Sequence, residues 1–261
     1  MKRRDFLKTS LAASALAGLS ATAAEPQAAQ EYYQLRVYRL KPGADHDLLD
    51  AYLEKAAIPA VNRLGIKNVG VFTEIEPKEA QAVYVLLPYA NLEAVGTVNA
   101  RLRTDPEYLQ AGAEYLQTPA SKPAYDRIDT WLMRAFAGIP KMEIPAYSRE
   151  KNPSRVFELR TYESYSESKA LKKIDMFNDG EMAVMREVGL GPVFFGQALI
   201  GANLPHLTYM LSAESRDAHK QHWDAFGKHA TWKKMSADPQ YKDTVSKIYN
   251  KILAPTSYSQ I

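Results

Sequence analysis

Residues 157–162 read Phe-Glu-Leu-Arg-Thr-Tyr, and residues 33–38 read Tyr-Gln-Leu-Arg-Val-Tyr. Both stretches follow the order aromatic, any residue, Leu, Arg, any residue, Tyr, and they start 124 positions apart. Side chains along each stretch alternate between apolar and polar, which is the two-residue period of a β-strand. The two stretches therefore predict a matching strand near the start of each of two related segments.

Three further matches follow in the same order along the chain. One keeps the separation of 124 positions, one has a separation of 125, and the last has a separation of 133. They are Val61–Ile66 with Met185–Leu190, Val83–Leu86 with Thr208–Leu211, and Asp105–Tyr108 with Asp238–Tyr241. Four ordered matches indicate an internal duplication, with a period that suits a pair of domains rather than a solenoid. The wider last separation predicts a gain of about eight residues between Tyr209 and Asp238.

Each copy has the pattern strand, helix, strand, strand, helix, strand, which predicts an α+β fold with sheet layered against helices. In the first copy we predict strands near residues 32–40, 67–76, 81–88 and 124–136, and helices near 44–63 and 91–116. In the second copy we predict strands near 155–163, 192–200, 206–212 and 252–260, and helices near 167–188 and 214–250. The predicted domains are a first module at 31–137, an extended Pro-containing linker at 138–153 and a second module at 154–261.

The first 24 residues have the order of an export signal. Arg3 and Arg4 precede a short Ala/Leu stretch at 11–19, and Ala21-Thr22-Ala23 supplies small residues for a signal peptidase. This order resembles the bacterial twin-arginine (Tat) signal, a route that carries proteins already folded. An uncleaved N-terminal anchor is the alternative, but nine mildly apolar residues are far fewer than the roughly 20 that a spanning helix needs. We therefore predict cleavage near Ala23 or Ala24 and a periplasmic or other extracytoplasmic protein without a stable membrane span.

Composition excludes several classes of function. The chain has no cysteine, which excludes disulfides, thiolate nucleophiles and thiolate metal sites. Without residues 1–23, basic and acidic side chains number 29 each, so the remaining chain has no net attraction for a nucleic-acid backbone. The expected partners are a small molecule, another envelope protein or further copies of the chain.

Several stretches resemble proteins of the NIPSNAP family. They are the Leu-Arg-x-Tyr opening of each copy, Asn178–Glu181, Val188–Gly196, Leu204–Met210, and Trp223 with Phe226 and Trp232. The resemblance implies a ferredoxin-like module in each copy and the fold of the dimeric α+β barrel superfamily, in which two four-stranded sheets face each other. Tandem copies could close such a barrel within one chain. Superfamily relatives include cofactor-free monooxygenases, haem-dependent enzymes and plain ligand binders, and the resemblance does not select among them.

The polar face of each opening strand is the predicted lining of a ligand pocket. If the Leu-containing face packs on helices, then Arg36, Tyr38, Glu158, Arg160 and Tyr162 look into the barrel, where each guanidinium needs a carboxylate, carbonyl or ligand. Three residues of the second copy complete the predicted ligand-binding set: Tyr209, His222 and Trp223. The alternative is a structural ion pair between Glu158 and Arg160 that holds the copies together.

Four of the five histidines lie between residues 206 and 229. His219, His222 and His229 fall along one stripe of a predicted helix, but aromatic residues interleave with them, so the stripe also suits a core-facing seam. A paired His-Glu-x-x-His motif is absent from the sequence, and we predict neither a metal site nor a cofactor. A single histidine could still act as a general base.

Three functions remain open at this point. The first is the binding of a small organic ligand in the barrel interior. The second is a cofactor-independent monooxygenase or isomerase acting on an aromatic or polyketide-like compound. The third is an interaction module for another envelope protein.

Overall fold

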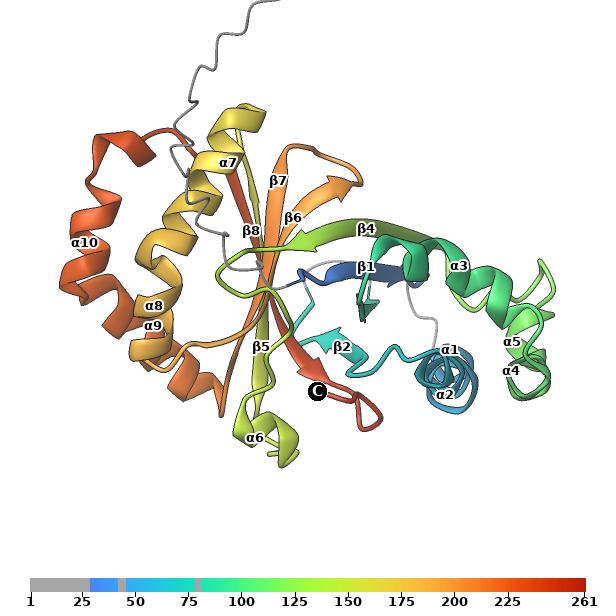
Figure 1. The fold of residues 1–261 in the computed structure, drawn as a ribbon. Coiled ribbons are helices and arrows are strands. Elements are labelled where there is room, and N and C mark those ends of the chain that lie inside the picture. Colours follow the sequence, from blue (N-terminus) through green and yellow to red (C-terminus); the bar gives the residue numbers. More distant parts are fainter. Residues whose placement is uncertain (1–28, 42–45, 78–80) are drawn as a thin grey trace, which may run out of the picture.

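The computed structural model describes residues 29–41, 46–77 and 81–261. Within them, the strands close into one barrel in the order β1-β3-β2-β8-β5-β7-β6-β4, and every neighbouring pair is antiparallel (Figure 1). The strands are β1 (Tyr32–Arg39), β2 (Gly70–Glu74), β3 (Ala82–Tyr89), β4 (Arg127–Ala135), β5 (Val156–Glu163), β6 (Gly191–Ile200), β7 (His206–Ala213) and β8 (Lys247–Pro255). Each copy supplies four consecutive strands of the order, so two sheets are joined at β2–β8 and at β4–β6. The predicted α+β barrel within one chain is therefore confirmed.

Two layers of helices cover the outside of the barrel on opposite flanks (Figure 1). The first copy contributes α1 (Asp47–Tyr52), α2 (Ile58–Arg63), α3 (Leu92–Leu102), α4 (Pro106–Ala111) and α5 (Ala113–Leu116). The second contributes α7 (Glu167–Met176), α8 (Met182–Glu187), α9 (Arg216–Lys228) and α10 (Ala230–Ser236), with a 3₁₀ turn at Pro239–Tyr241. A π-helical turn joins α1 to α2 at Leu53–Ala57, and another joins α7 to α8 at Phe177–Glu181, again 124 positions apart. The shared irregularity supports duplication independently of the sequence matches.

Strand register corrects one of the predicted matches. Arg36 lies opposite Val85, and Arg160 lies opposite Tyr209, so β3 and β7 correspond at a separation of 124 and not 125. Tyr84 and Tyr209 are therefore not equivalent, and they lie on opposite faces of their sheets. The gain before Asp238 is consequently nine residues rather than eight.

The predicted orientation of the opening strands was wrong. Leu35, Val37 and Leu159 belong to the apolar cluster inside the barrel, whereas Tyr38 and Tyr162 belong to the clusters beneath the helices. Because a closed barrel buries both faces of each sheet, the period of two separates the faces but does not say which one meets the helices. Aliphatic and aromatic side chains pack in the barrel interior, while the helices bring polar partners to the outer face.

Two boundaries also differ from the predictions. β8 begins at Lys247, so the expected helix at 214–250 ends early and the expected strand at 252–260 starts about five residues too late. β8 forms hydrogen bonds with β5 on one side and with β2 on the other, and it thereby joins the sheets of the two copies. The stretch at 138–153 is not simply extended, because it contains the short helix α6 (Ala146–Arg149) and packs Met142 and Ile144 against the barrel core. The export signal lies outside the described residues.

Candidate functional site

One end of the barrel is packed solid, and the other end is hollow. Phe72 packs on Phe157 with ring centroids 4.8 Å apart, and Tyr33 packs on Phe194 at 5.0 Å, which closes the first end. Ile261 is fully buried in the same cluster. At the opposite end, a cavity of about 300 Å³ opens between strands of both copies. We call this the mouth cavity. Its walls include Leu35, Val37, Tyr84, Trp131, Leu159 and Tyr249.

Four of the five charged side chains that line the mouth cavity pair with one another, and the fifth is the half-buried Glu163. Arg39 donates to Asp129 at 2.9 Å, and Lys251 donates to both oxygens of Glu74 at 3.0 and 3.1 Å. The hydroxyl of Tyr84 also donates to Glu74. Since these four charges cancel in pairs and the Glu163 carboxylate would repel an anion, the cavity suits a ligand that is mainly apolar and carries no negative charge.

His206 is the most deeply buried ionisable side chain along this cavity, with 3% of its surface exposed. It occupies the inward register of β7, like Met210 farther along the strand. Its Nδ1 lies 3.4 Å from the Thr208 hydroxyl, and its Nε2 has no hydrogen-bond partner among the described residues. Burial lowers the pKa of His206, and the nearby Glu163 carboxylate only partly opposes this effect. The imidazole is therefore neutral at pH 7.

The turn between β6 and β7 lies directly against a wall of the mouth cavity. Gly201 has φ +147°, and a Cβ added there would lie 2.3 Å from Cδ1 of Trp131. Any side chain at this position would displace the indole ring from the cavity wall. Glycine is therefore needed both for the backbone conformation and for the close approach.

Most of the predicted site residues of the second copy form a buried network beneath α9. Glu158 is its centre, with 2% of its side chain exposed. Its Oε1 accepts from Arg160 at 2.7 Å, and its Oε2 accepts from Trp223 Nε1 at 2.7 Å and lies 2.9 Å from His219 Nε2. Arg160 also donates to the Tyr162 hydroxyl at 3.2 Å, which in turn lies 2.8 Å from the hydroxyl of Tyr209. The guanidinium lies over the indole of Trp223, 4.7 Å from the ring centroid.

The network favours the ionised form of its central carboxylate. Burial alone would raise the pKa of Glu158, but the hydrogen bond from His219 and the charge of Arg160 lower it to about 2. Arg160 is therefore paired with a carboxylate. This agrees with the alternative prediction, in which Glu158 and Arg160 form a structural ion pair. Neither Glu158 nor Arg160 lines the mouth cavity.

The other predicted site residues lie elsewhere. His222 does not join the Glu158 network; it packs against the end of α8, where a Cβ on Gly189 would lie 2.8 Å from its Nε2. Arg36 and Tyr38 lie beneath the helices of the first copy, on the opposite flank of the barrel. The eight residues therefore do not form one site, and their role in binding a ligand stays a prediction.

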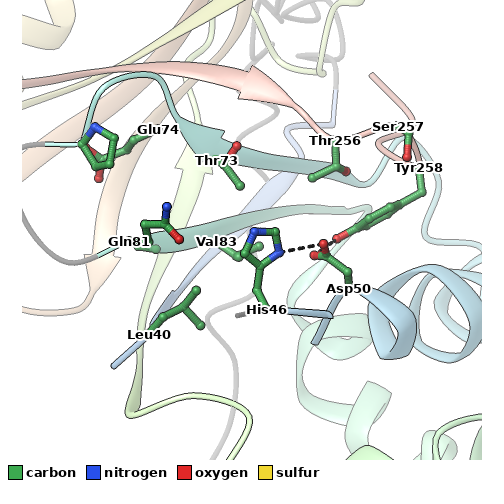
Figure 2. Close-up of a pocket in the computed structure, with 12 residues that line it drawn as sticks. Leu40, His46, Asp50, Thr73, Glu74, Gln81, Val83, Thr256, Ser257 and Tyr258 are labelled. Carbon is green, nitrogen blue, oxygen red and sulfur yellow. Dashed lines mark hydrogen bonds and ion pairs between the residues drawn. The ribbon is translucent and has the colours of Figure 1, made fainter. Parts of the chain in front are cut away.

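A second hollow lies beside the first copy and shares Glu74 and Ala82 with the mouth cavity. It has a volume of about 330 Å³, and Figure 2 shows His46, Asp50 and Tyr258 converging at its edge. Asp50 accepts from the Tyr258 hydroxyl at 2.6 Å, and its other oxygen lies 2.7 Å from His46 Nδ1. These contacts fasten the segment that follows β8 onto helix α1, so a structural role accounts for them.

The described residues contain neither a cluster of metal ligands nor a helix that could span a membrane. No group of three or more His, Asp or Glu side chains within them is arranged to hold a metal ion. In the same part of the chain, no helix has the length and apolar character needed to cross a membrane.

Solved structures with a similar fold have very different sequences. A candidate monooxygenase from Fusobacterium nucleatum has 10% identity and a TM-score of 0.57, over 87% of this chain and 93% of that one. A candidate monooxygenase from Lactobacillus acidophilus has 10% identity and a TM-score of 0.54, over 87% and 94%. An anthrone oxidase-like protein has 12% identity and a TM-score of 0.51, over 87% and 92%. These likenesses show the barrel fold alone. Curated proteins gave no match.

Comparison with family models identifies both the export route and the modules. Residues 1–20 match the TAT (twin-arginine translocation) pathway signal sequence, so the chain is exported to the periplasm or another extracytoplasmic space. Residues 33–121 and 157–260 both match the NIPSNAP model. These segments cover more than half of the chain, one in each half of the barrel, and the protein therefore belongs to the NIPSNAP family.

Proposed function

We propose that this exported NIPSNAP protein binds a small, mainly apolar organic molecule in the mouth cavity. The observation that carries the proposal is the combination of an open hollow of about 300 Å³ with His206, whose Nε2 has no partner among the described residues. Apolar and aromatic walls would supply most of the affinity, and a few polar groups would set the orientation. Both copies contribute to the walls, so the binding surface exists only in the closed barrel.

The chemistry of the lining favours a ligand without a negative charge. The ion pairs Arg39–Asp129 and Lys251–Glu74 are already complete. The hydroxyls of Thr161 and Thr208 lie 2.8 Å apart and can each offer one further hydrogen bond. Trp131, Tyr84 and Tyr249 offer flat aromatic surfaces. A ring compound bearing a hydroxyl or carbonyl group fits this set of partners.

The binding proposal can be tested with N-phenyl-1-naphthylamine, an uncharged probe with three aromatic rings that fluoresces in apolar surroundings. Ala202 lines the mouth cavity and is itself exposed, so Ala202→Trp should obstruct the entrance without disturbing the core. We expect this variant to bind the probe at least roughly tenfold more weakly, a difference of about 1.4 kcal/mol.

The matched control is Ala100→Trp, which adds the same side chain at an exposed position of α3. It should bind the probe like the unmodified protein. Equal affinity in Ala202→Trp and Ala100→Trp would refute binding in the mouth cavity, and so would an unmodified protein that does not bind the probe.

A cofactor-independent oxygenase or isomerase is the second candidate, and His206 is the observation that favours it. A neutral imidazole beside an apolar cavity can accept a proton from a carbon acid, and burial keeps His206 in that form at pH 7. Because one structural neighbour is an anthrone oxidase-like protein, anthrone is a suitable trial substrate.

The catalytic proposal predicts oxygen uptake with anthrone that His206→Gln reduces by at least about 100-fold, the lower range for loss of a general base. Binding of N-phenyl-1-naphthylamine by the same variant should persist. Oxygen uptake that is unchanged by His206→Gln would exclude His206 as the base, while failure of the unmodified protein to consume oxygen with anthrone would argue against oxygenase activity on this class of substrate.

A further inference from the structure

The half-buried guanidinium of Arg36 in the first copy lacks the carboxylate that its counterpart in the second copy has. Arg36 and Arg160 occupy equivalent positions on β1 and β5, two residues after Gln34 and Glu158 respectively. Arg160 is matched by Glu158 at 2.7 Å. Within the described residues, Arg36 forms no ion pair, and the groups that act on it electrostatically are tyrosines. The first copy therefore has the same cation as the second, but it has the neutral amide of Gln34 where the second copy has the Glu158 carboxylate.

Gln34 is itself occupied by other partners. Its Oε1 accepts a hydrogen bond from the Tyr89 hydroxyl at 3.1 Å, and its Nε2 donates to Thr130 at 3.3 Å. The Gln34 amide is therefore hydrogen-bonded to Tyr89 and Thr130 but contributes no charge. A guanidinium removed from water beside neutral groups carries a desolvation cost that only an anion offsets fully.

Tyrosines surround Arg36 on the helix side of the sheet. Tyr38 accepts a hydrogen bond from it, and Tyr52 and Tyr89 lie close by. Tyr52 stacks on Tyr115 with ring centroids 3.7 Å apart, which fixes the position of its ring. Burial raises the pKa of Tyr38, Tyr52 and Tyr89, so these phenols stay protonated and provide no negative charge. Tyr89 already donates to Gln34, and the Tyr52 hydroxyl lies 2.9 Å from that of Tyr108, so of the three the Tyr38 O–H is the donor for a guest.

A small cavity lies at this point. It has a volume of about 30 Å³. Its lining consists of Arg36, the three tyrosine neighbours of Arg36, and aliphatic side chains that include residues of the sheet, α2 and α3. This is space for one atom-sized guest, about the volume that one water molecule occupies in the liquid. A sulfate or phosphate ion is too large for it, and no second charged side chain lines it.

We propose that a small monovalent anion of the size of chloride binds in this cavity and neutralises Arg36. The guanidinium supplies charge and N–H donors, and Tyr38 supplies an O–H donor. Aliphatic walls favour a weakly hydrated halide over a strongly hydrated divalent anion. The ion supplies the negative charge that the Glu158 carboxylate supplies in the second copy. The site lies on the outer face of the sheet and does not depend on ligand binding in the mouth cavity.

The first test compares thermal stability in chloride, bromide, gluconate and sulfate at equal ionic strength. We expect the unfolding midpoint of the unmodified protein to rise with chloride and bromide concentration relative to gluconate, and not with sulfate. Gln34→Glu places a carboxylate where the second copy has Glu158, so its midpoint should no longer respond to halide. Asn99→Asp adds the same charge at an exposed position of α3 and should keep the response.

A halide response that is equal in Gln34→Glu and Asn99→Asp would overturn the proposal, and so would a wild-type midpoint that is the same in chloride and gluconate. If Gln34→Glu does not fold, crystals of the unmodified protein grown in bromide show whether an anion binds at Arg36. An anomalous bromide peak within hydrogen-bonding distance of the Arg36 guanidinium supports the site. The absence of a peak there, with bromide bound only at the surface, refutes it.

Discussion

Replacing Glu158 with Gln should lower the free energy of unfolding by roughly 3–5 kcal/mol, the usual cost of removing one partner from a buried ion pair. The variant leaves Arg160 without a counter-charge and gives His219 and Trp223 a weaker acceptor. Urea denaturation at pH 7 measures the change. As a control, Glu143→Gln removes the exposed ion pair with Arg186 and should cost less than about 1 kcal/mol.

The same substitution should also change the acid sensitivity of the protein. The pKa of Glu158 is lowered from 4.5 to about 2, so the carboxylate stabilises the fold fully above pH 4.5, by about 3 kcal/mol. This contribution is lost as the pH falls through 2. The difference between the unmodified protein and Glu158→Gln should therefore shrink steadily from pH 5 to pH 2. A difference that stays constant over this range would show that the carboxylate charge is not what stabilises the network.

Replacing Lys173 with Met should cost a similar roughly 3–5 kcal/mol. Lys173 Nζ lies 2.6 Å from Glu181 Oε2, and the two side chains are only 5% and 2% exposed. The ammonium also lies over Phe177, 4.5 Å from its ring centroid. Burial raises the pKa of Glu181 despite the charge of Lys173. Without Lys173 the carboxyl should stay protonated to still higher pH, so the variant should become less stable as the pH rises and Glu181 is forced to ionise.

The double substitution Lys173→Met with Glu181→Leu provides the control for that prediction. Because the site is enclosed by apolar and aromatic groups, replacing both charges should recover most of the stability lost in Lys173→Met. Urea denaturation of the two single variants and the double variant completes a double-mutant cycle. A double variant whose loss equals the sum of the two single losses would show that the ion pair is not energetically coupled.

Much of the fold follows from local patterns in the sequence. The Leu-Arg-x-Tyr repeat identifies β1 and β5, and the helix stops at Gly65 and Gly189 fix the ends of α2 and α8. The face of each strand could not be assigned, because both faces of a closed barrel are buried. The position of β8 depends on pairing with β2, a strand nearly 180 residues earlier, and no local pattern reports such a contact.

Contacts between site residues were predictable only where the partners are close in sequence. Glu158, Arg160 and Tyr162 follow one another on a single strand face, and the sequence points to them together. The pair Lys251–Glu74 joins residues 177 positions apart, and nothing in either neighbourhood indicates the other. Lys173 was missed as well, although it lies on the same helical stripe as the buried Ala170 and Phe177, which is a signal for a buried lysine.

The joining of β8 to both β5 and β2 has a consequence for biogenesis. Of the strands in the barrel, β8 leaves the ribosome last, and until it arrives the sheet of the first copy has an open edge and an uncovered apolar face. A nascent chain is thus vulnerable to aggregation until translation of the final strand is complete. Since the twin-arginine route accepts folded cargo, the closing strand sets the earliest moment at which this protein can leave the cytoplasm.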